Sequence, residues 1–146
     1  WTVTGDEGSG EQRAIARENA EKLELNLAFY QVDVLKPGQG AFKEKYDIIV
    51  SNPPYILPSE KDRMGASTLA HEPDMALFVP EEDPLLFYRE IAGVAAAALE
   101  VGGHLFFETN EFNNEQVVEL TKELGFTQVE ARQDMRGKWR MVRGVK

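Results

Sequence analysis

The chain of 146 residues carries a formal charge of −9 and contains no cysteine. These residues therefore form no disulfide, thiolate nucleophile or cysteine-bound zinc site. The acidic charge argues against broad nucleic-acid binding, because phosphate contacts need clustered Lys and Arg. No apolar run approaches the roughly 18 residues of a membrane span, and no signal peptide is visible. We therefore expect a cytoplasmic protein that does not associate with a membrane. With His71 and His104 as its histidines, the chain is expected to hold no metal.

The first part of the chain is expected to form a helix and two strands. Residues 11–25 carry apolar side chains at helical spacing, which predicts an amphipathic helix. Residues 26–34 alternate apolar and polar side chains and predict a strand, and a loop rich in Gly, Pro and Lys follows over residues 35–45. Residues 46–51 form a short apolar run of the kind that a parallel sheet buries on both faces.

A long helix and a further strand are expected next. Residues 83–100 are typical of a helix, and Asp83 stands where a side chain caps the first turn. Gly102-Gly103 are expected to end this helix and to separate it from the next strand, since two successive glycines favour a break in secondary structure. Residues 104–108, an apolar run that ends on a glutamate, then predict a strand.

The last third is expected to form a second capped helix and a hairpin. Residues 113–126 have helical periodicity, with Gly125 as the stop signal. Residues 126–133 and 138–145 alternate and are joined by Asp-Met-Arg-Gly, which predicts an antiparallel pair. A basic cluster lies here, which we interpret as a solvated hairpin face, with a local acidic or nucleic-acid partner as the alternative: Arg132, Arg136, Lys138, Arg140, Arg143 and Lys146.

Strands that alternate with helices predict an α/β fold with a mainly parallel sheet and helices on both faces. A chain of this length is expected to form one domain over residues 1–146. In such sheets, ligands bind at the carboxyl ends of the strands. The sequence Asn-Pro-Pro-Tyr, residues 52–55, directly follows the predicted strand at 46–51 and is therefore expected at the ligand-binding edge.

The Asn-Pro-Pro-Tyr loop (Asn52, Pro53, Pro54 and Tyr55) gathers hydrogen-bond acceptors beside an aromatic ring. Two successive prolines fix φ at about −65° and donate no N–H. Asn52 adds an amide, and Tyr55 adds a flat ring and a hydroxyl. These groups suit a planar NH2 group held in line with an electrophile, and such positioning can contribute ~7–11 kcal/mol. The alternative is a rigid turn in which Asn52 caps the backbone and Tyr55 packs.

Several segments resemble the release-factor glutamine N5-methyltransferases, the HemK/PrmC group of class I S-adenosylmethionine (SAM) methyltransferases. The resemblance covers residues 11–144 and is carried by IARENAEKL, YDIIVSNPPYI, HEPDMALF, LLFYREIA, LEVGGHLFFE and DMRGKWRMVRG. It implies a Rossmann-like sheet and methyl transfer from SAM to the glutamine amide in the Gly-Gly-Gln tip of class I peptide-chain release factors. An rRNA or DNA amino-methyltransferase is the alternative enzyme, and a non-catalytic remnant that binds a release factor or itself is a further alternative.

The resemblance also implies roles for single residues. The Asn52 side chain and the Pro53 carbonyl would accept the two N–H groups of the glutamine amide beside the methyl donor. Pro54 belongs to the same substrate-binding loop, and Tyr55 would pack over the substrate as part of the catalytic site. No general base is implied, because positioning and exclusion of water would activate the amide nitrogen.

For the cofactor, the resemblance implies that Asp33 contacts the adenine amine of SAM, that Val34 lines the adenine pocket and that Asn52 also belongs to the cofactor-binding residues. The alternative for Asp33 is a turn residue at the end of the strand. Glu72-Pro73 match a Glu-Pro pair that we interpret as loop architecture. Glu108 matches a carboxylate at the end of the family's next strand, and no role is implied for it.

The N-terminal residues fit the family in two ways. In the first, residues 1–6 are the family's second strand, and Asp6 accepts hydrogen bonds from the ribose diol of SAM. In the second, residues 5–10 form a reduced glycine loop, in which Gly8 and Gly10 let the backbone approach the methyl donor near a helix N-terminus. A flexible surface linker is the alternative for Gly8-Ser9-Gly10. The spacing favours the first, in which the helical N-terminal domain, the first strand and the glycine loop of the family are absent. An unpaired edge beside residues 46–51 then predicts a homodimer or a strand swap.

Overall fold

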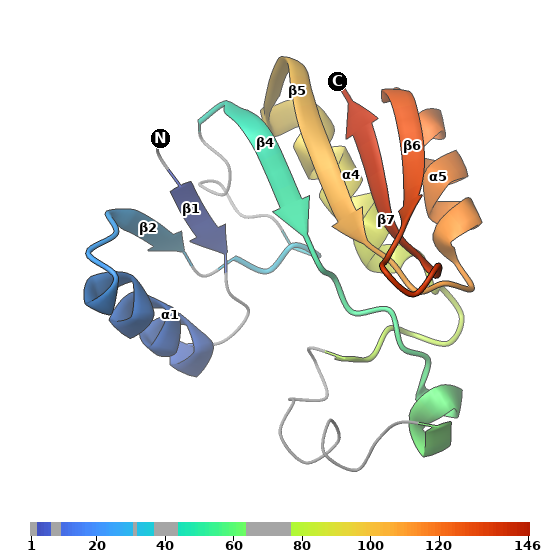
Figure 1. Cartoon of the computed structure of the whole chain (residues 1–146), viewed down its shortest axis with the longest axis horizontal. Coiled ribbons are helices and arrows are strands. Elements are labelled where there is room, and N and C mark those ends of the chain that lie inside the picture. Colours follow the sequence, from blue (N-terminus) through green and yellow to red (C-terminus); the bar gives the residue numbers. More distant parts are fainter. Residues whose placement is uncertain (1–2, 7–9, 31, 37–43, 64–76) are drawn as a thin grey trace. The chain divides into compact units, whose positions relative to one another are not determined.

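The computed structural model describes residues 3–6, 10–30, 32–36, 44–63 and 77–146 of the chain. These residues belong to two compact units, Trp1–Ala41 and Phe42–Lys146 (Figure 1). No helix among the described residues is long and apolar enough to cross a membrane. The single catalytic domain expected over residues 1–146 stays a prediction.

The first unit is a βαβ element. β1 (Val3–Asp6) and β2 (Leu27–Tyr30) are parallel and pair from Val3 with Leu27 to Asp6 with Tyr30. The helix α1 (Gly10–Lys22) connects them, as the periodicity of residues 11–25 predicts. β2 is shorter than the strand expected over residues 26–34. Because the two strands are parallel, both carboxyl ends lie at one edge of this small sheet.

The second unit contains a four-stranded sheet in the order β4-β5-β7-β6. β4 (Tyr46–Ser51) is parallel to β5 (Leu99–Glu108). β7 (Trp139–Val145) is antiparallel both to β5 and to β6 (Thr127–Gln133), which confirms the terminal hairpin. Parallel pairing in both units together with this hairpin agrees with the expected α/β class.

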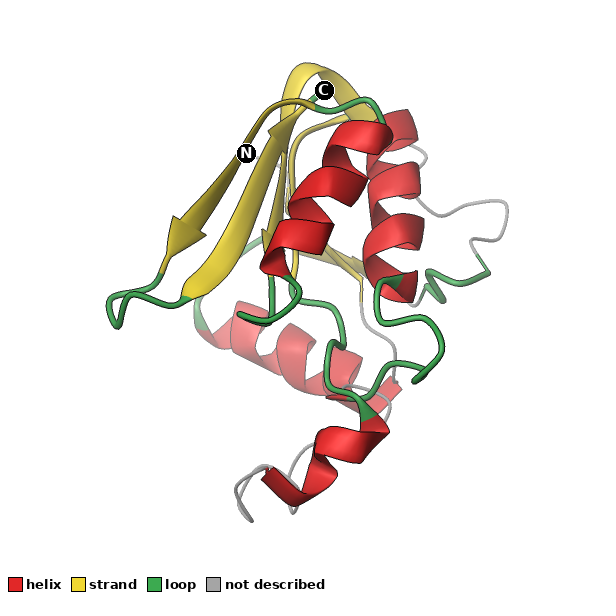
Figure 2. Cartoon of the chain, turned by 90° about the vertical axis from the view of Figure 1, so that its right-hand side faces the viewer, coloured by secondary structure: helices red, strands yellow, loops and turns green. Residues whose placement is uncertain are grey.

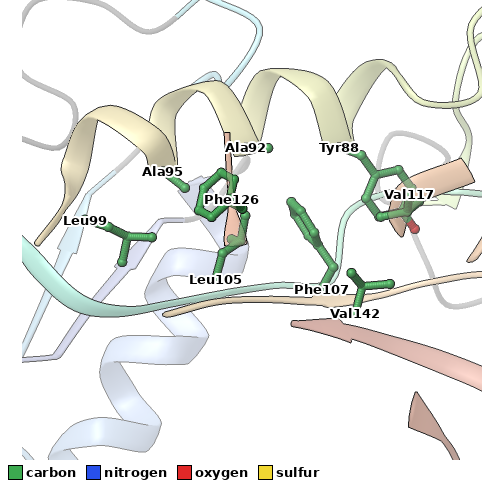
Figure 3. Close-up of a cluster of buried hydrophobic side chains, with 9 residues drawn as sticks. All are labelled: Tyr88, Ala92, Ala95, Leu99, Leu105, Phe107, Val117, Phe126 and Val142. Carbon is green, nitrogen blue, oxygen red and sulfur yellow. The ribbon is translucent and has the colours of Figure 1, made fainter. Parts of the chain in front are cut away.

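Two helices cover one face of the four-stranded sheet (Figure 2). They are α4 (Leu86–Ala98) and α5 (Asn114–Glu123), and a short 3-10 helix, η1 (Pro58–Arg63), lies in the connection that follows β4. The hydrophobic core fills the space between the helices and the sheet (Figure 3). Its buried members are Tyr88, Ala92, Ala95, Leu99, Leu105, Phe107, Val117, Phe126 and Val142.

The expected burial of residues 46–51 on both faces is wrong for this unit. Ile49 packs against the core, whereas Ile48 is 47% exposed and Val50 is 73% exposed. Alternate residues of a strand point to opposite faces, and α4 and α5 lie on the face that Ile49 shares with Leu105, its partner in β5. β4 is also an edge strand of this sheet, and a homodimer or strand swap at this edge stays a prediction.

The two helices of this unit lack the side-chain caps that their sequences predict. α4 begins three residues after Asp83, behind Leu85, which makes no capping hydrogen bond. The Asp83 carboxylate instead accepts two hydrogen bonds from Arg89, at 2.7 and 3.0 Å. Asn113 precedes α5, and its side chain makes no capping bond either. At the other end of α5, Gly125 adopts a φ of +89°, and the helix stops where it was expected to stop.

Gly102-Gly103 do not separate α4 from the next strand, because β5 begins at Leu99 and runs through both glycines. Two backbone hydrogen bonds hold them against the end of β7. Gly102 N–H donates to the Lys146 carbonyl oxygen, and Lys146 N–H donates to the Gly103 carbonyl oxygen, both at 2.9 Å. The expected strand at residues 104–108 is therefore the second half of a longer one.

Candidate functional site

The Asn-Pro-Pro-Tyr loop leaves the carboxyl end of β4 and is held at both of its ends. On one side, Ser51 closes β4 and pairs with Phe107 of the parallel strand β5. On the other side, Ile56 forms an isolated parallel bridge with Phe78, and Val79 N–H donates to the Ile56 carbonyl oxygen at 3.0 Å. Because two of the four residues between these anchors are prolines, the loop backbone has few alternative conformations.

The side chains of the loop divide into anchors and an exposed amide. Pro53 is buried, Pro54 and Tyr55 are half-buried, and Tyr55 packs against the hydrophobic core. Asn52 is exposed, and within the described part of the chain no hydrogen-bond partner holds its side chain. The loop thus presents an exposed amide, which can donate and accept hydrogen bonds, on a stiff backbone, as a site for a planar amide requires.

The Tyr55 hydroxyl lies among charged groups. Burial, and after it the negative charge of Glu108, raise the pKa of Tyr55, and the positive charge of Arg140 opposes them. Burial is the largest of these causes, so the neutral phenol is the favoured form. Tyr88 of α4 lies in the same cluster, and its hydroxyl donates to the Glu108 backbone oxygen at 3.1 Å.

Sequence reasoning did not bring these residues together. From the sequence, Glu108 has no implied role, Arg140 belongs to the basic cluster, and no pattern connects Tyr88 with the Asn-Pro-Pro-Tyr loop. One signal was available for Glu108, because it ends the predicted strand that follows the Asn-Pro-Pro-Tyr strand. If two such strands are parallel neighbours, their carboxyl ends meet at one edge.

The residues expected to bind SAM lie in the first unit. Asp6 ends β1 and pairs with Tyr30, the last residue of β2, and Asp33 follows three residues later. Asp33 is exposed, and its Oδ1 accepts the N–H of Leu35 at 3.0 Å, so its carboxylate has a defined orientation. Val34 beside it is half-buried. An exposed and oriented carboxylate at the carboxyl edge of parallel strands fits the amine and hydroxyl donors of an adenosine group.

The other residues singled out in the sequence are not part of either group of side chains. Glu72-Pro73 and Gly8-Ser9 lie outside the described residues, while Gly10 begins α1. Among the residues that the structure describes, no group of three His, Asp or Glu side chains is arranged to hold a metal ion. Asp6 and Asp33 belong to one unit, and the Asn-Pro-Pro-Tyr loop belongs to the other.

Comparison with known proteins identifies the relatives of the chain. A release factor glutamine methyltransferase from Bacteroides thetaiotaomicron is 42% identical over 134 residues, which are 92% of this chain and 48% of that protein. The chain is a relative of the release factor glutamine methyltransferases. The enzyme of that name from Flavobacterium psychrophilum is 36% identical over 130 residues, 89% of this chain and 45% of that protein. The chain therefore spans about half the length of the curated relatives it matches. No family model matches it.

Solved structures establish the fold. The 16S rRNA N2 G1207 methyltransferase of Thermus thermophilus, solved with AdoMet and guanosine, matches 99% of this chain with a TM-score of 0.67. The match covers 31% of that protein, and 22% of the aligned residues are identical. The α/β methyltransferase fold expected from the sequence is thereby confirmed, and so is the resemblance to the release-factor glutamine methyltransferases.

Proposed function

We propose that this chain carries the catalytic loop of a SAM-dependent methyltransferase that modifies the side-chain amide nitrogen of a protein glutamine. The proposed substrate is the Gly-Gly-Gln tip of a class I peptide-chain release factor, and the proposed location is the cytoplasm. The observation that carries the proposal is the Asn-Pro-Pro-Tyr loop, which holds an exposed Asn52 and a half-buried Tyr55 at the end of a strand parallel to β5. The names of the sequence relatives support the choice of substrate.

The chemistry follows from the weakness of the nucleophile. The lone pair of an amide nitrogen is delocalised, so orientation and exclusion of water must lower most of the barrier. In the proposed complex, the Asn52 side-chain oxygen and the Pro53 carbonyl accept the two amide N–H groups, Pro54 stiffens the backbone between them and Tyr55, and the Tyr55 ring covers the amide. SAM supplies an electrophilic methyl group when bound. Asp33, Val34 and Asp6 would hold its adenosine.

A pair of variants tests separately the two parts of this proposal, the binding of the glutamine amide by Asn52 and the binding of the cofactor by Asp33. Asn52→Ala is expected to lower methyl transfer from labelled SAM to a release factor by about 10²–10³-fold, the usual effect of removing one oriented hydrogen-bond partner. The affinity for S-adenosylhomocysteine, measured by calorimetry, should change less than in Asp33→Ala. Asp33→Ala should abolish micromolar binding of this ligand. Each variant is thus the control for the other.

Each part of the proposal has its own contradicting result. Normal glutamine methylation by Asn52→Ala would show that the loop does not hold the amide. Binding of S-adenosylhomocysteine that survives in Asp33→Ala would remove Asp33 from the cofactor site. No binding to the unsubstituted chain at millimolar ligand would overturn a cofactor site in these residues, while the sequence relationship would stand.

The alternative of a nucleic-acid substrate has weaker support. Phosphate binding needs basic side chains that are free to release counterions. In the hairpin, several basic side chains have acidic partners within 4 Å: Arg132 and Arg143 with Glu130, Lys138 with Glu111, and Arg140 with Asp134. These pairs favour the solvated hairpin face expected from the sequence, and we propose that the chain has no broad nucleic-acid surface.

A further inference from the structure

The loop that follows β5, residues 109–113, lies next to the Asn-Pro-Pro-Tyr loop at one end of the four-stranded sheet (Figure 1). Ser51 pairs with Phe107, so the two loops leave neighbouring parallel strands that lie about 4.8 Å apart. The turn between β6 and β7, residues 134–138, lies at this end as well, because the antiparallel β7 starts beside the last residues of β5. A polypeptide bound at Asn52 that continues toward β5 therefore meets this loop first and the turn next.

The loop 109–113 holds an aromatic side chain out in solvent on an ordered backbone. Phe112 is 78% exposed. Its N–H donates to Oδ1 of Asn110 at 3.1 Å, and the N–H of Asn113 donates to the Asn110 carbonyl oxygen at 3.3 Å. A side chain on such a fixed backbone loses little conformational entropy when a partner binds it.

Two contacts join this loop to the β6–β7 hairpin. The N–H of Thr109 donates to the Arg140 carbonyl oxygen at 2.8 Å, and the Glu111 carboxylate pairs with Lys138 at 2.7 Å. Met135, in the turn, is fully exposed. The loop and the turn thus present a phenylalanine and a methionine, which we call the apolar rim, and both residue types are enriched where proteins bind one another.

We propose that the apolar rim binds the polypeptide segment that flanks the glutamine in the protein substrate, with Phe112 as the main anchor. This inference rests on the proposed function. An extended segment advances about 3.3–3.6 Å per residue, so residues a few positions from a glutamine held at Asn52 reach the loop after β5. Arg136 of the turn is exposed, and among the described side chains no acidic one lies within 4 Å of it. The segment that fits this surface carries an apolar side chain and a carboxylate.

The first test measures KM and kcat for methyl transfer to a release factor. Phe112→Ala is expected to raise KM by about 5–30-fold, the usual effect of truncating one large anchor side chain. The kcat should stay nearly unchanged, because contacts with flanking residues act equally in the ground state and the transition state. Met135→Ala should act in the same direction with a smaller effect. Val101→Ala is the matched control, since this apolar side chain is 91% exposed near the opposite end of β5.

The second test does not need activity. Calorimetry of release-factor binding should show the same rise in Kd for Phe112→Ala and no change for Val101→Ala. Arg136→Ala should weaken binding more at low salt than at high salt, because salt screens an exposed charge. The substituted side chains are exposed, so the midpoint of urea unfolding should stay close to that of the unsubstituted chain, which separates lost contacts from misfolding.

Unchanged KM and Kd in Phe112→Ala would overturn this proposal alone and leave the proposed function standing. A dimer of the chain that Phe112→Ala converts to a monomer, with no change in Kd for the release factor, would assign the apolar rim to a second copy and also overturn it. Binding of a release factor that depends on Phe112 without methylation of its glutamine would instead overturn the proposed function and leave the apolar rim its partner. No binding of a release factor to the unsubstituted chain would overturn both.

Discussion

Gly144 of β7 illustrates how closely single residues are packed where the hairpin meets α5. A Cβ atom at this position would lie 2.9 Å from Cγ2 of Thr121 and 3.0 Å from Cβ of Phe126. Thr121 cannot turn away without loss, because it is buried and its hydroxyl donates to the Val117 carbonyl oxygen at 2.7 Å. The sheet and the helix can approach this closely only because residue 144 has no side chain.

Gly144→Ala is therefore expected to lower the free energy of unfolding by about 1–3 kcal/mol, the usual cost of overpacking a core. Gly93→Ala is the matched control, because a Cβ at that position on α4 meets no atom within 4 Å. Alanine is favoured over glycine in a helix by about 1 kcal/mol, so this control should be neutral or stabilising. Urea denaturation measures both. Equal effects of the two substitutions would contradict the close contact between β7 and α5.

Among the elements, the β6–β7 hairpin depends on the carboxylate of Asp134. Its Oδ1 accepts the backbone N–H groups of Arg136 at 2.8 Å and of Lys138 at 3.0 Å. Gly137 completes the turn with a φ of +76°. These backbone donors, Lys138 first, hold the pKa of Asp134 below its ordinary value. The turn is thus ordered by one ionised side chain.

Asp134→Ala is expected to loosen the hairpin, seen as faster hydrogen exchange at the β6 and β7 amides nearest the turn. The pKa of Asp134 is depressed in the folded state, so its contribution is present above the unfolded pKa of about 4 and is lost as pH falls through the folded value. Asp134→Asn keeps a side-chain acceptor and should retain the turn without this pH dependence. Exchange rates that are unchanged in Asp134→Ala would show that backbone pairing alone holds the hairpin.

The same elements indicate what a sequence can predict. α1, α5 and the hairpin follow local periodicity, and the Asn-Pro-Pro-Tyr loop is readable because a stiff turn directly follows an apolar strand. The early start of β5 depends on the pairing of Gly102 and Gly103 with Lys146, more than forty positions away. The gathering of Tyr55, Glu108 and Arg140 likewise needs the registers of β4, β5 and β7. Contacts of that range are set by tertiary packing and leave no local pattern.

At the scale of the whole molecule, the buried core is divided unequally between the two units. All members of the main hydrophobic cluster belong to the second unit. In the described part of the first unit, Ala20 is the buried apolar side chain, while several larger ones are exposed: Ile15, Leu23, Leu25 and Tyr30. Local stability follows buried apolar contact, so the first unit should open at a lower free energy than the second.

Native-state hydrogen exchange tests this difference on the intact chain. The amides of α1 are expected to report an opening free energy at least about 2 kcal/mol smaller than those of β5 and β7, whose exchange should follow global unfolding. If Asp33 contributes to a cofactor site, S-adenosylhomocysteine at about 100 times its dissociation constant should raise the value for α1 by about 2.7 kcal/mol. Equal opening energies without the ligand would contradict the division, because they would mean that both units open in one cooperative step. Asp6 and Asp33, the residues proposed to bind the cofactor, lie in the unit expected to be less stable. A rise in the opening free energy of α1 on addition of the ligand would therefore show that ligand binding is coupled to the folding of that unit.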